Sequence, residues 1–224
     1  MEWSEPGIVL SVRRHGESAA IVSLFTREHG RHLGLVRGGA GRRRRGMLQP
    51  GNLVAATWRA RLPEHLGSLV CEPVEAFAAR VLEEPDRLEA MVASLAVLDS
   101  ALAEHEAHRT LYAATVALLQ ILAGSAPPPG AGAPAWAISY VRWEVRCLAE
   151  FGFGLDLARG DLARGELTAR PVWVSPRTGR AVGAEQGAPY ASRLLALPAF
   201  LTESGRGEET ATPAGTPTAA DIRA

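Results

Sequence analysis

Four consecutive arginines lie between glycines in VRGGAGRRRRGMLQPG at 36–51. Guanidinium groups in such a run could hold the phosphates of a nucleotide, follow the backbone of a nucleic acid, or lie in a hydrated turn. The spacing of Gly41 and Gly46 matches half of a P-loop, which next requires a Lys and a Ser or Thr. Met47 and Leu48 occupy those two positions, so the nucleotide interpretation fails.

Charge is distributed unevenly along the chain, although its 224 residues carry no net charge. Residues 1–61 contain 11 Arg and 4 Glu, whereas residues 81–126 contain 2 Arg and 7 acidic residues. No Asp or Glu occurs between Glu28 and Glu64, a stretch that holds eight arginines. Because all 24 basic residues are Arg, which codon bias explains, each Arg is read only as a basic residue. The asymmetry favours an anionic polymer as the partner over a merely hydrated loop.

The other candidates for catalysis or metal binding have the wrong spacing. HEAH at 105–108 places its histidines three residues apart, whereas a helical zinc motif needs four. His29 and His32 have no further ligand nearby in the sequence. Cys71 and Cys147 stand far apart among apolar residues, which indicates buried hydrophobic side chains. We therefore expect no enzyme, no catalytic residue, no metal and no cofactor.

The first 77 residues contain short apolar runs bounded by Gly and polar turns, which is typical of β-strands. Five such runs fit a small barrel or a sandwich, and we expect a five-stranded β-barrel of the oligonucleotide-binding (OB) type. In the third run the alternation places Arg31 and Leu33 on one face and His32 and Gly34 on the other. The expected strands are 7–16, 18–26, 30–38, 52–62 and 67–77.

Beyond Arg80 the apolar period changes from two to about 3.6 residues, which predicts helices over 83–105, 108–124 and 135–152. The third helix is apolar on most faces, so we expect it at the centre of a helical bundle. APPPGAGAP at 126–134 predicts a linker. The predicted buried stripes are Leu88, Met91, Val92, Leu95, Leu98 and Leu102 in the first helix, and Leu111, Thr115, Leu118 and Leu122 in the second.

The C-terminal part has a mixed pattern. PVWVSPRTGRAV at 171–182 predicts a small β-hairpin that turns between Pro176 and Gly179. Residues 202–224 lack large apolar side chains apart from Ile222, so we expect them to be disordered. The predicted fold class is α+β and multi-domain: an OB-type barrel at 1–80, then an α-helical domain at 81–201 that includes a hairpin region at about 153–190. With neither a signal peptide nor an apolar run of about 20 residues, we expect a cytoplasmic protein.

The basic barrel is the best candidate for a binding site. OB barrels lay a sugar-phosphate backbone across a positive groove and stack bases on exposed aromatic rings. Aromatic candidates are few, since Phe25 and Phe77 suit the core and the pattern leaves Trp58 either exposed or buried. Affinity should then depend on phosphates and sequence preference should be weak. The predicted DNA-binding residues are Arg13, Arg14, Arg31, Arg37, Arg42, Arg43, Arg44, Arg45, Arg59 and Arg61.

Several segments resemble the bacterial DNA repair and recombination protein RecO family. They are GIVLSVRRHGESAAIVSLFTREHGRHLGLVRGGA, the basic loop with LQPGNLV, FGFGLDL, and WVSPRTGRAV with the segment that follows it; together they extend over about 4–201. The resemblance implies an OB barrel followed by a helical domain, and binding of single- and double-stranded DNA at the nucleoid. It also implies ATP-independent annealing of complementary strands. RecR and single-stranded-DNA-binding protein would be partners in loading RecA.

Two further expectations follow from this resemblance. The helical domain would bind the acidic C-terminal tail of single-stranded-DNA-binding protein, and Arg142 and Arg146, one turn apart, are the candidates. Many family members also hold zinc with four cysteines before the hairpin. Here 158–173 contains no Cys or His, so we expect no metal, and a hairpin held by Val172, Trp173, Val174 and Val182. An RNA-binding or ribosome-associated OB module, and a hydrolase with a concealed site, stay as alternatives.

Overall fold

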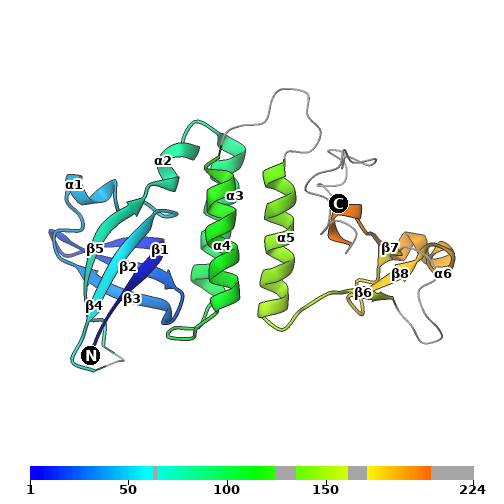
Figure 1. The fold of residues 1–224 in the computed structure, drawn as a ribbon, viewed down its shortest axis with the longest axis horizontal. Helices are drawn as coiled ribbons and strands as arrows, with labels where there is room; N and C mark the ends of the chain where they lie inside the picture. The colour runs from blue at the N-terminus through cyan, green and yellow to red at the C-terminus, as the bar shows by residue number, and fades with distance from the viewer. Residues whose placement is uncertain (63–64, 125–134, 161–170, 203–224) are drawn as a thin grey trace. The chain divides into compact units, whose positions relative to one another are not determined.

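The computed structural model describes residues 1–62, 65–124, 135–160 and 171–202. The chain packs as two compact units, Met1–Ser125 and Ala126–Ala224, each of which is described by itself (Figure 1). The first unit contains the predicted barrel together with two long helices. The domain limits 1–80 and 81–201 stay predictions. The linker at 126–134 and the tail after Thr202 lie outside the described residues.

The N-terminal strands form a closed barrel in the order β1-β2-β3-β5-β4, which confirms the OB-type fold (Figure 1). Strand β1 begins at Glu2, earlier than predicted, because its first half pairs with β4 while its second half pairs with β2. A change of register between Val9 and Ser11 lies between these two halves. The strands are β1 (Glu2–His15), β2 (Ala19–Thr26), β3 (Gly30–Val36), β4 (Leu53–Arg59) and β5 (Ser68–Glu75).

The barrel core follows the predicted alternation. In β3, His32 and Gly34 are buried while Arg31 and Leu33 are only half-buried, as expected. Trp58 is 2 % exposed, which decides the open question of its position. Its indole N–H donates to the Leu33 carbonyl at 3.1 Å, so the polar edge of the ring is satisfied inside the barrel. Phe25 and Phe77 are also buried, as predicted.

Three helices complete the first unit: α2 (Phe77–Val81), α3 (Pro85–Ala101) and α4 (Arg109–Leu122). The predicted stripe of α4 is buried throughout. In α3, however, Val92 is 55 % exposed, while Arg87 is buried at 4 %. The Arg87 guanidinium donates to the carbonyls of Leu122 (2.9 Å) and Gly124 (2.5 Å), where α4 ends. Because the last carbonyls of a helix lack intrahelical donors, this arginine supplies a cap from a neighbouring helix.

Polar contacts within the first unit fasten the barrel to these helices. Ser23 on β2 donates to Asp99 on α3 at 2.6 Å. Tyr112 on α4 donates its hydroxyl to the carbonyl of Pro6 at 3.2 Å, and its ring meets Phe25 edge-on. A Cβ on Gly30 would lie 1.9 Å from the carbonyl oxygen of Glu106, so no other residue fits at this turn. The barrel and α3–α4 therefore form one packed body.

The second unit contains α5 (Ala135–Glu150) and a sheet in the order β6-β8-β7-β9. The predicted hairpin is confirmed, with β7 (Pro171–Val174) antiparallel to β8 (Arg180–Gly183). Among its residues α5 buries Ala137, Trp143 and Cys147; its expected place at the centre of a helical bundle stays a prediction. The remaining elements are β6 (Asp156–Gly160), α6 (Ala184–Gly187), η1 (Ala188–Arg193), β9 (Leu195–Ala196) and η2 (Ala199–Leu201).

The core of the hairpin differs in part from the prediction. Val174 and Val182 are buried, but Val172 is 37 % exposed. Trp173 is half-buried and packs so closely on Gly187 that a Cβ there would lie 2.4 Å from the indole ring. The buried cluster is Val174, Ala181 and Leu197, with Leu157 and Leu201 packed against it. None of the described helices is long and apolar enough to cross a membrane.

The cap made by Arg87 leads to a stability prediction. Arg87→Met keeps the length of the side chain but leaves two helix-end carbonyls without their donor. We expect the free energy of unfolding in urea to fall by about 2–3 kcal/mol. Arg80→Met is the control, because Arg80 is exposed and pairs with Glu75 at the surface, where loss of a pair costs at most about 1 kcal/mol. Equal losses in the two variants would contradict a capping role for Arg87.

Candidate nucleic-acid interface

Strand pairing brings arginines from distant positions to one end of the barrel. Arg13 and Arg14 lie near the end of β1, and Arg14 is in register with Ala20 of β2. Ala20 is in turn in register with Val36, the last residue of β3, which Arg37 follows directly. The closing turns of these strands thus place Arg13, Arg14 and Arg37 at the same edge.

The four adjacent arginines form one helical turn, α1 (Arg42–Arg45). The backbone N–H of Leu48 donates to the carbonyl of Arg44 at 3.0 Å. Leu48 itself is 2 % exposed and belongs to the barrel core. The guanidinium of Arg44 donates to the carbonyl of Arg37 at 2.6 Å, which ties the turn to the end of β3.

Asn52 fastens the other side of this turn. Its side-chain amide donates to the carbonyls of Gly46 (2.9 Å) and Met47 (3.2 Å). Its side-chain oxygen accepts from the backbone N–H of Ala78 at 3.0 Å. Since Asn52 is buried at 3 % exposure, these bonds are shielded from water. The arginine turn is therefore held at both ends by the barrel.

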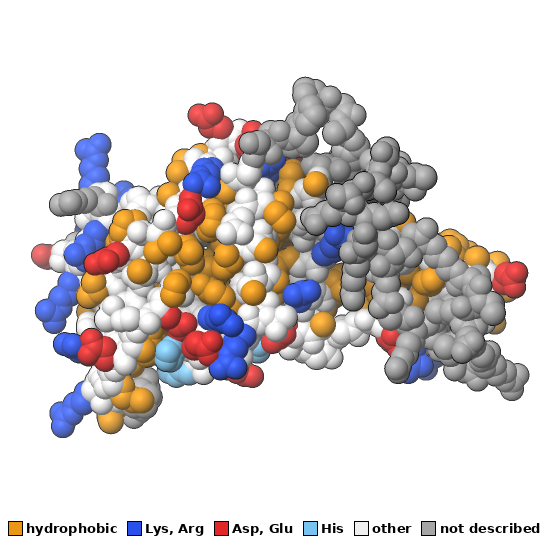
Figure 2. Space-filling view, in the orientation of Figure 1, with side chains coloured by type: hydrophobic (Ala, Val, Ile, Leu, Met, Phe, Trp, Pro, Cys, Tyr) orange, Lys and Arg blue, Asp and Glu red, His pale blue; other side chains and the backbone are white. Residues whose placement is uncertain are grey.

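Six arginines make up what we call the basic cluster: Arg13, Arg14, Arg37, Arg42, Arg44 and Arg45. All six side chains are exposed. Within the described part of the chain, none of them forms an ion pair with a carboxylate. Figure 2 shows basic side chains projecting from the margin of the barrel where Figure 1 places α1. Unneutralised guanidinium groups at this density create a positive potential that attracts anions.

The other predicted arginines are not brought into the basic cluster. The side chain of Arg31 is only 17 % exposed; it donates to the carbonyl of Leu102 at 2.9 Å and pairs with Glu104 at 3.1 Å. Arg59 pairs with Glu2, at the opposite end of β1 from Arg13 and Arg14, and Arg61 is exposed just beyond β4. The side chain of Arg43 lies outside the described residues. Arg31 therefore joins the barrel to the helices.

A hollow of about 240 Å³ opens inside the basic cluster. Arg14 from β1 and Arg45 from α1 both line it. The chain passes closely over its edge, because a Cβ on Gly39 would lie 2.9 Å from that of Ala20. The lining residues are Val12, Arg14, Ala20, Gly39, Ala40, Arg45, Leu48, Gln49 and Pro50. The sequence pattern did not reveal this hollow, because its residues come from three separate segments.

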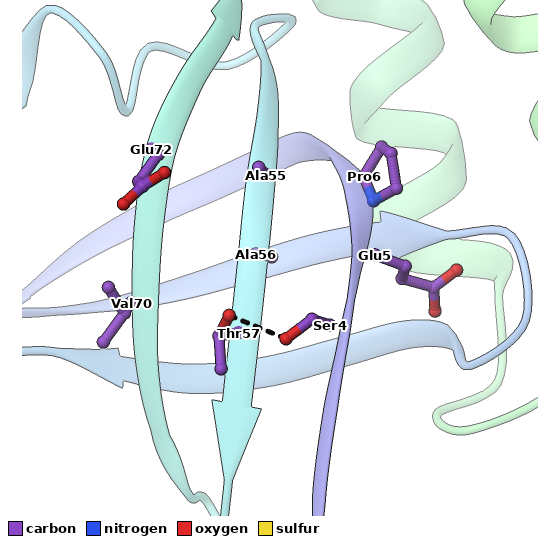
Figure 3. Close-up of a pocket in the computed structure, with 8 residues that line it drawn as sticks. All are labelled: Ser4, Glu5, Pro6, Ala55, Ala56, Thr57, Val70 and Glu72. Atoms are coloured by element: carbon purple, nitrogen blue, oxygen red, sulfur yellow. Dashed lines mark hydrogen bonds between the residues drawn. The ribbon is translucent and has the colours of Figure 1, made fainter.

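A second hollow, of about 280 Å³, lies over β1, β4 and β5 (Figure 3). The hydroxyl groups of Ser4 and Thr57 hydrogen-bond across it at 2.8 Å. Its lining residues are Ser4, Glu5, Pro6, Ala55, Ala56, Thr57, Val70 and Glu72. The carboxylate of Glu5 points away from Glu72 and hydrogen-bonds to His29 (Figure 3). No basic side chain lines this hollow, in contrast to the hollow at the basic cluster.

The cysteines are placed as buried packing residues, as the sequence predicted. Burial raises the pKa of the thiols of Cys71 and Cys147 to about 12, so both stay protonated at neutral pH. These are the only cysteines in the sequence, and neither lies in the segment where family members hold zinc. The donor set therefore does not fit that metal site. No group of three His, Cys, Asp or Glu residues is placed to hold a metal in the described ranges.

A histidine and tryptophan cluster, which the sequence did not reveal, joins β3 to the α3–α4 connection. Trp3 stacks on His29 with ring centroids 4.4 Å apart. His32 is 7 % exposed and lies 4.6 Å from the Trp58 ring and 4.2 Å from that of His105. Desolvation, and next the nearby His105, lower the pKa of His32 to about 4. His32 is therefore neutral at physiological pH and serves packing.

This cluster predicts a pH dependence of stability. Since the pKa of His32 falls from its ordinary 6.5 to about 4 on folding, the unfolded chain binds a proton between these values that the folded chain does not. The free energy of unfolding should therefore fall by up to roughly 3 kcal/mol as the pH drops from 6.5 to 4. Urea titrations across this range measure it. His32→Phe should flatten the profile and the exposed control His15→Phe should not; an unchanged slope in His32→Phe would contradict the assignment.

Two family models match this chain, and they divide it directly after the barrel rather than between the two compact units. The family model described as "Recombination protein O N terminal" matches residues 1–77, and the one described as "Recombination protein O C terminal" matches residues 82–221. The chain belongs to the RecO family. The resemblance read from the sequence motifs is confirmed, and this RecO-family chain is accordingly a DNA repair protein.

Relatives of this RecO-family chain match over most of its length. It is 51 % identical over 209 residues to DNA repair protein RecO of Rhodospirillum rubrum, covering 90 % of this chain and 78 % of the relative. For the protein of the same name from Rhodospirillum centenum the identity is 49 % over 209 residues, with 92 % and 79 % covered. That of Roseobacter denitrificans is 44 % identical over 211 residues, with 93 % and 83 % covered.

Proposed function

We propose that this chain binds single- and double-stranded DNA through the basic cluster and anneals complementary strands without ATP, as a mediator of recombinational repair. The observation that carries the proposal is that six exposed arginines, with no carboxylate partner among the described residues, lie at one end of an OB barrel, where two of them, Arg14 and Arg45, line a hollow. The names of its relatives, all DNA repair proteins, support DNA as the polymer.

The proposed mechanism is electrostatic. Two complementary strands repel each other through their phosphates, and guanidinium groups that contact both strands reduce that repulsion. Base pairing then supplies the free energy of annealing, so no nucleotide is hydrolysed and no catalytic residue is needed. Because α1 is held by Leu48 and Asn52, its charges are ordered before DNA binds, which lowers the entropic cost of association. Incubation with labelled DNA, with no cleavage expected, tests the absence of hydrolysis.

We also propose the partners that the family resemblance implies: RecR, and the acidic tail of single-stranded-DNA-binding protein, in the loading of RecA at the nucleoid. On α5, Arg142 and Arg146 are both exposed. Arg142 donates to the carbonyl of Phe200 at 3.0 and 3.2 Å, which holds the segment around η2. Arg146 is therefore the residue to which we assign the acidic tail. Binding of a tail peptide to Arg146→Ala, with Arg142→Ala as the structural comparison, tests this assignment.

The annealing proposal predicts the behaviour of the arginine turn. Changing Arg42, Arg43, Arg44 and Arg45 together to Ala keeps the helix propensity of α1 but removes four charges. We expect the rate of annealing, measured with fluorescent complementary oligonucleotides, to fall by at least about tenfold. The rate should also depend less steeply on salt than in the wild type, since fewer counterions are released.

A charge-matched control separates this site from general charge loss. Changing Arg27, Arg80, Arg177 and Arg193 to Ala removes the same number of charges, from exposed positions outside the basic cluster. This control should anneal at close to the wild-type rate. If both quadruple variants slow annealing equally, or if neither does, the basic cluster is not the annealing site.

A further inference from the structure

The hollow within the basic cluster has an apolar interior. Ala20 and Leu48, at 1 % and 2 % exposure, lie at its base, and Val12, Ala40 and Pro50 add further apolar surface. Its volume of about 240 Å³ is below the range of about 300–1,000 Å³ that holds drug-sized ligands. Such a space suits one planar ring system. A phosphate alone would gain nothing from these apolar walls.

Two guanidinium groups stand at the rim and come from separate elements. Arg14 belongs to β1 and donates to the carbonyl of Glu17 at 3.1 Å, which orients it at the β1–β2 turn. Arg45 belongs to α1, which Arg44 ties to the carbonyl of Arg37. In a nucleic-acid strand each internal nucleotide has a phosphate on either side. A base in the hollow would thus have two cationic groups near its two flanking phosphates.

Gln49 supplies the third polar side chain of the lining. Its side chain is exposed, and its amide makes no hydrogen bond to the described part of the chain. An amide offers both donors and an acceptor, which matches the mixed donors and acceptors on the edge of any nucleobase. Gln49 can therefore contact a base edge without strict selection of one base.

We infer that this hollow binds a single unstacked base of a DNA strand while Arg14 and Arg45 hold its neighbouring phosphates. This inference rests on the proposed function and adds the chemical group that the site recognises. A base in a duplex enters only after unpairing and unstacking, so the hollow favours single strands. The other bases of the strand stay free to pair with the complementary strand.

The test compares strands with and without bases. We expect the wild type to bind oligothymidylate about tenfold more tightly than an abasic strand of the same length, because the base buries apolar surface in the hollow. Ala40→Leu adds bulk to the hollow and should abolish this difference while leaving binding to the abasic strand and to duplex DNA unchanged. Gly46→Leu adds one carbon more than Ala40→Leu, at a position where a Cβ meets no atom within 4 Å, and should keep the difference.

A second variant, Gln49→Ala, keeps the test decisive if Ala40→Leu misfolds. A mononucleotide competitor distinguishes a base within a strand from the base of a free nucleotide. Gln49→Ala alters an exposed side chain and should lower the preference for oligothymidylate over the abasic strand about threefold. Thymidine monophosphate should not displace the strand. Equal binding of both strands by the wild type, an unchanged ratio in Ala40→Leu, or displacement by the mononucleotide would overturn the inference. The proposed function itself fails separately, if the wild type binds neither strand at low salt.

Discussion

Like charges repel, and this barrel concentrates six arginines at one end with no carboxylate paired to them among the described residues. The repulsion is weakened by water and salt but not removed at the short distances within a single helical turn. Burial of Leu48 in the barrel core and the three side-chain hydrogen bonds of Asn52 oppose it. Stability of this end therefore comes from apolar packing and buried hydrogen bonds, which leaves the charge free for a ligand. An anionic polymer that binds here also relieves the repulsion.

Arginine has two roles in this chain: some arginines join elements of the fold, and others expose their charge to solvent. The groups that surround each guanidinium decide which role it has. Arg31 and Arg87 have carbonyls or carboxylates placed around them, and they join strands to helices or helix to helix. Arg13 and Arg42 are exposed and have no such partners among the described residues. The groups around each guanidinium therefore decide whether its charge is available to a ligand.

The period-two alternation predicted the barrel correctly because one face of every strand must be buried, and this depends on local pattern alone. Trp58 could not be assigned until the Leu33 carbonyl was seen to accept its N–H. In α3 four of the six predicted stripe residues are buried, but burial of Arg87 depends on Leu122 and Gly124, far away in the sequence, and could not be predicted. The helical turn of α1 likewise depends on distant anchors, and the hollow needs three segments brought together. The local sequence pattern predicts the secondary-structure elements and the distribution of charge. Contacts between residues far apart in the sequence become known only from the folded structure.

The most direct test of the account is the salt dependence of equilibrium binding to single-stranded DNA. For the wild type, the logarithm of the binding constant should fall linearly with the logarithm of salt concentration, with a slope of about 0.7 for each phosphate neutralised. Changing Arg13, Arg14 and Arg37 together to Ala should reduce that slope by about two units, because these residues contribute to the same cluster as α1. A wild-type slope near zero, or an unchanged slope in the triple variant, would contradict the claim that the basic cluster holds the DNA backbone.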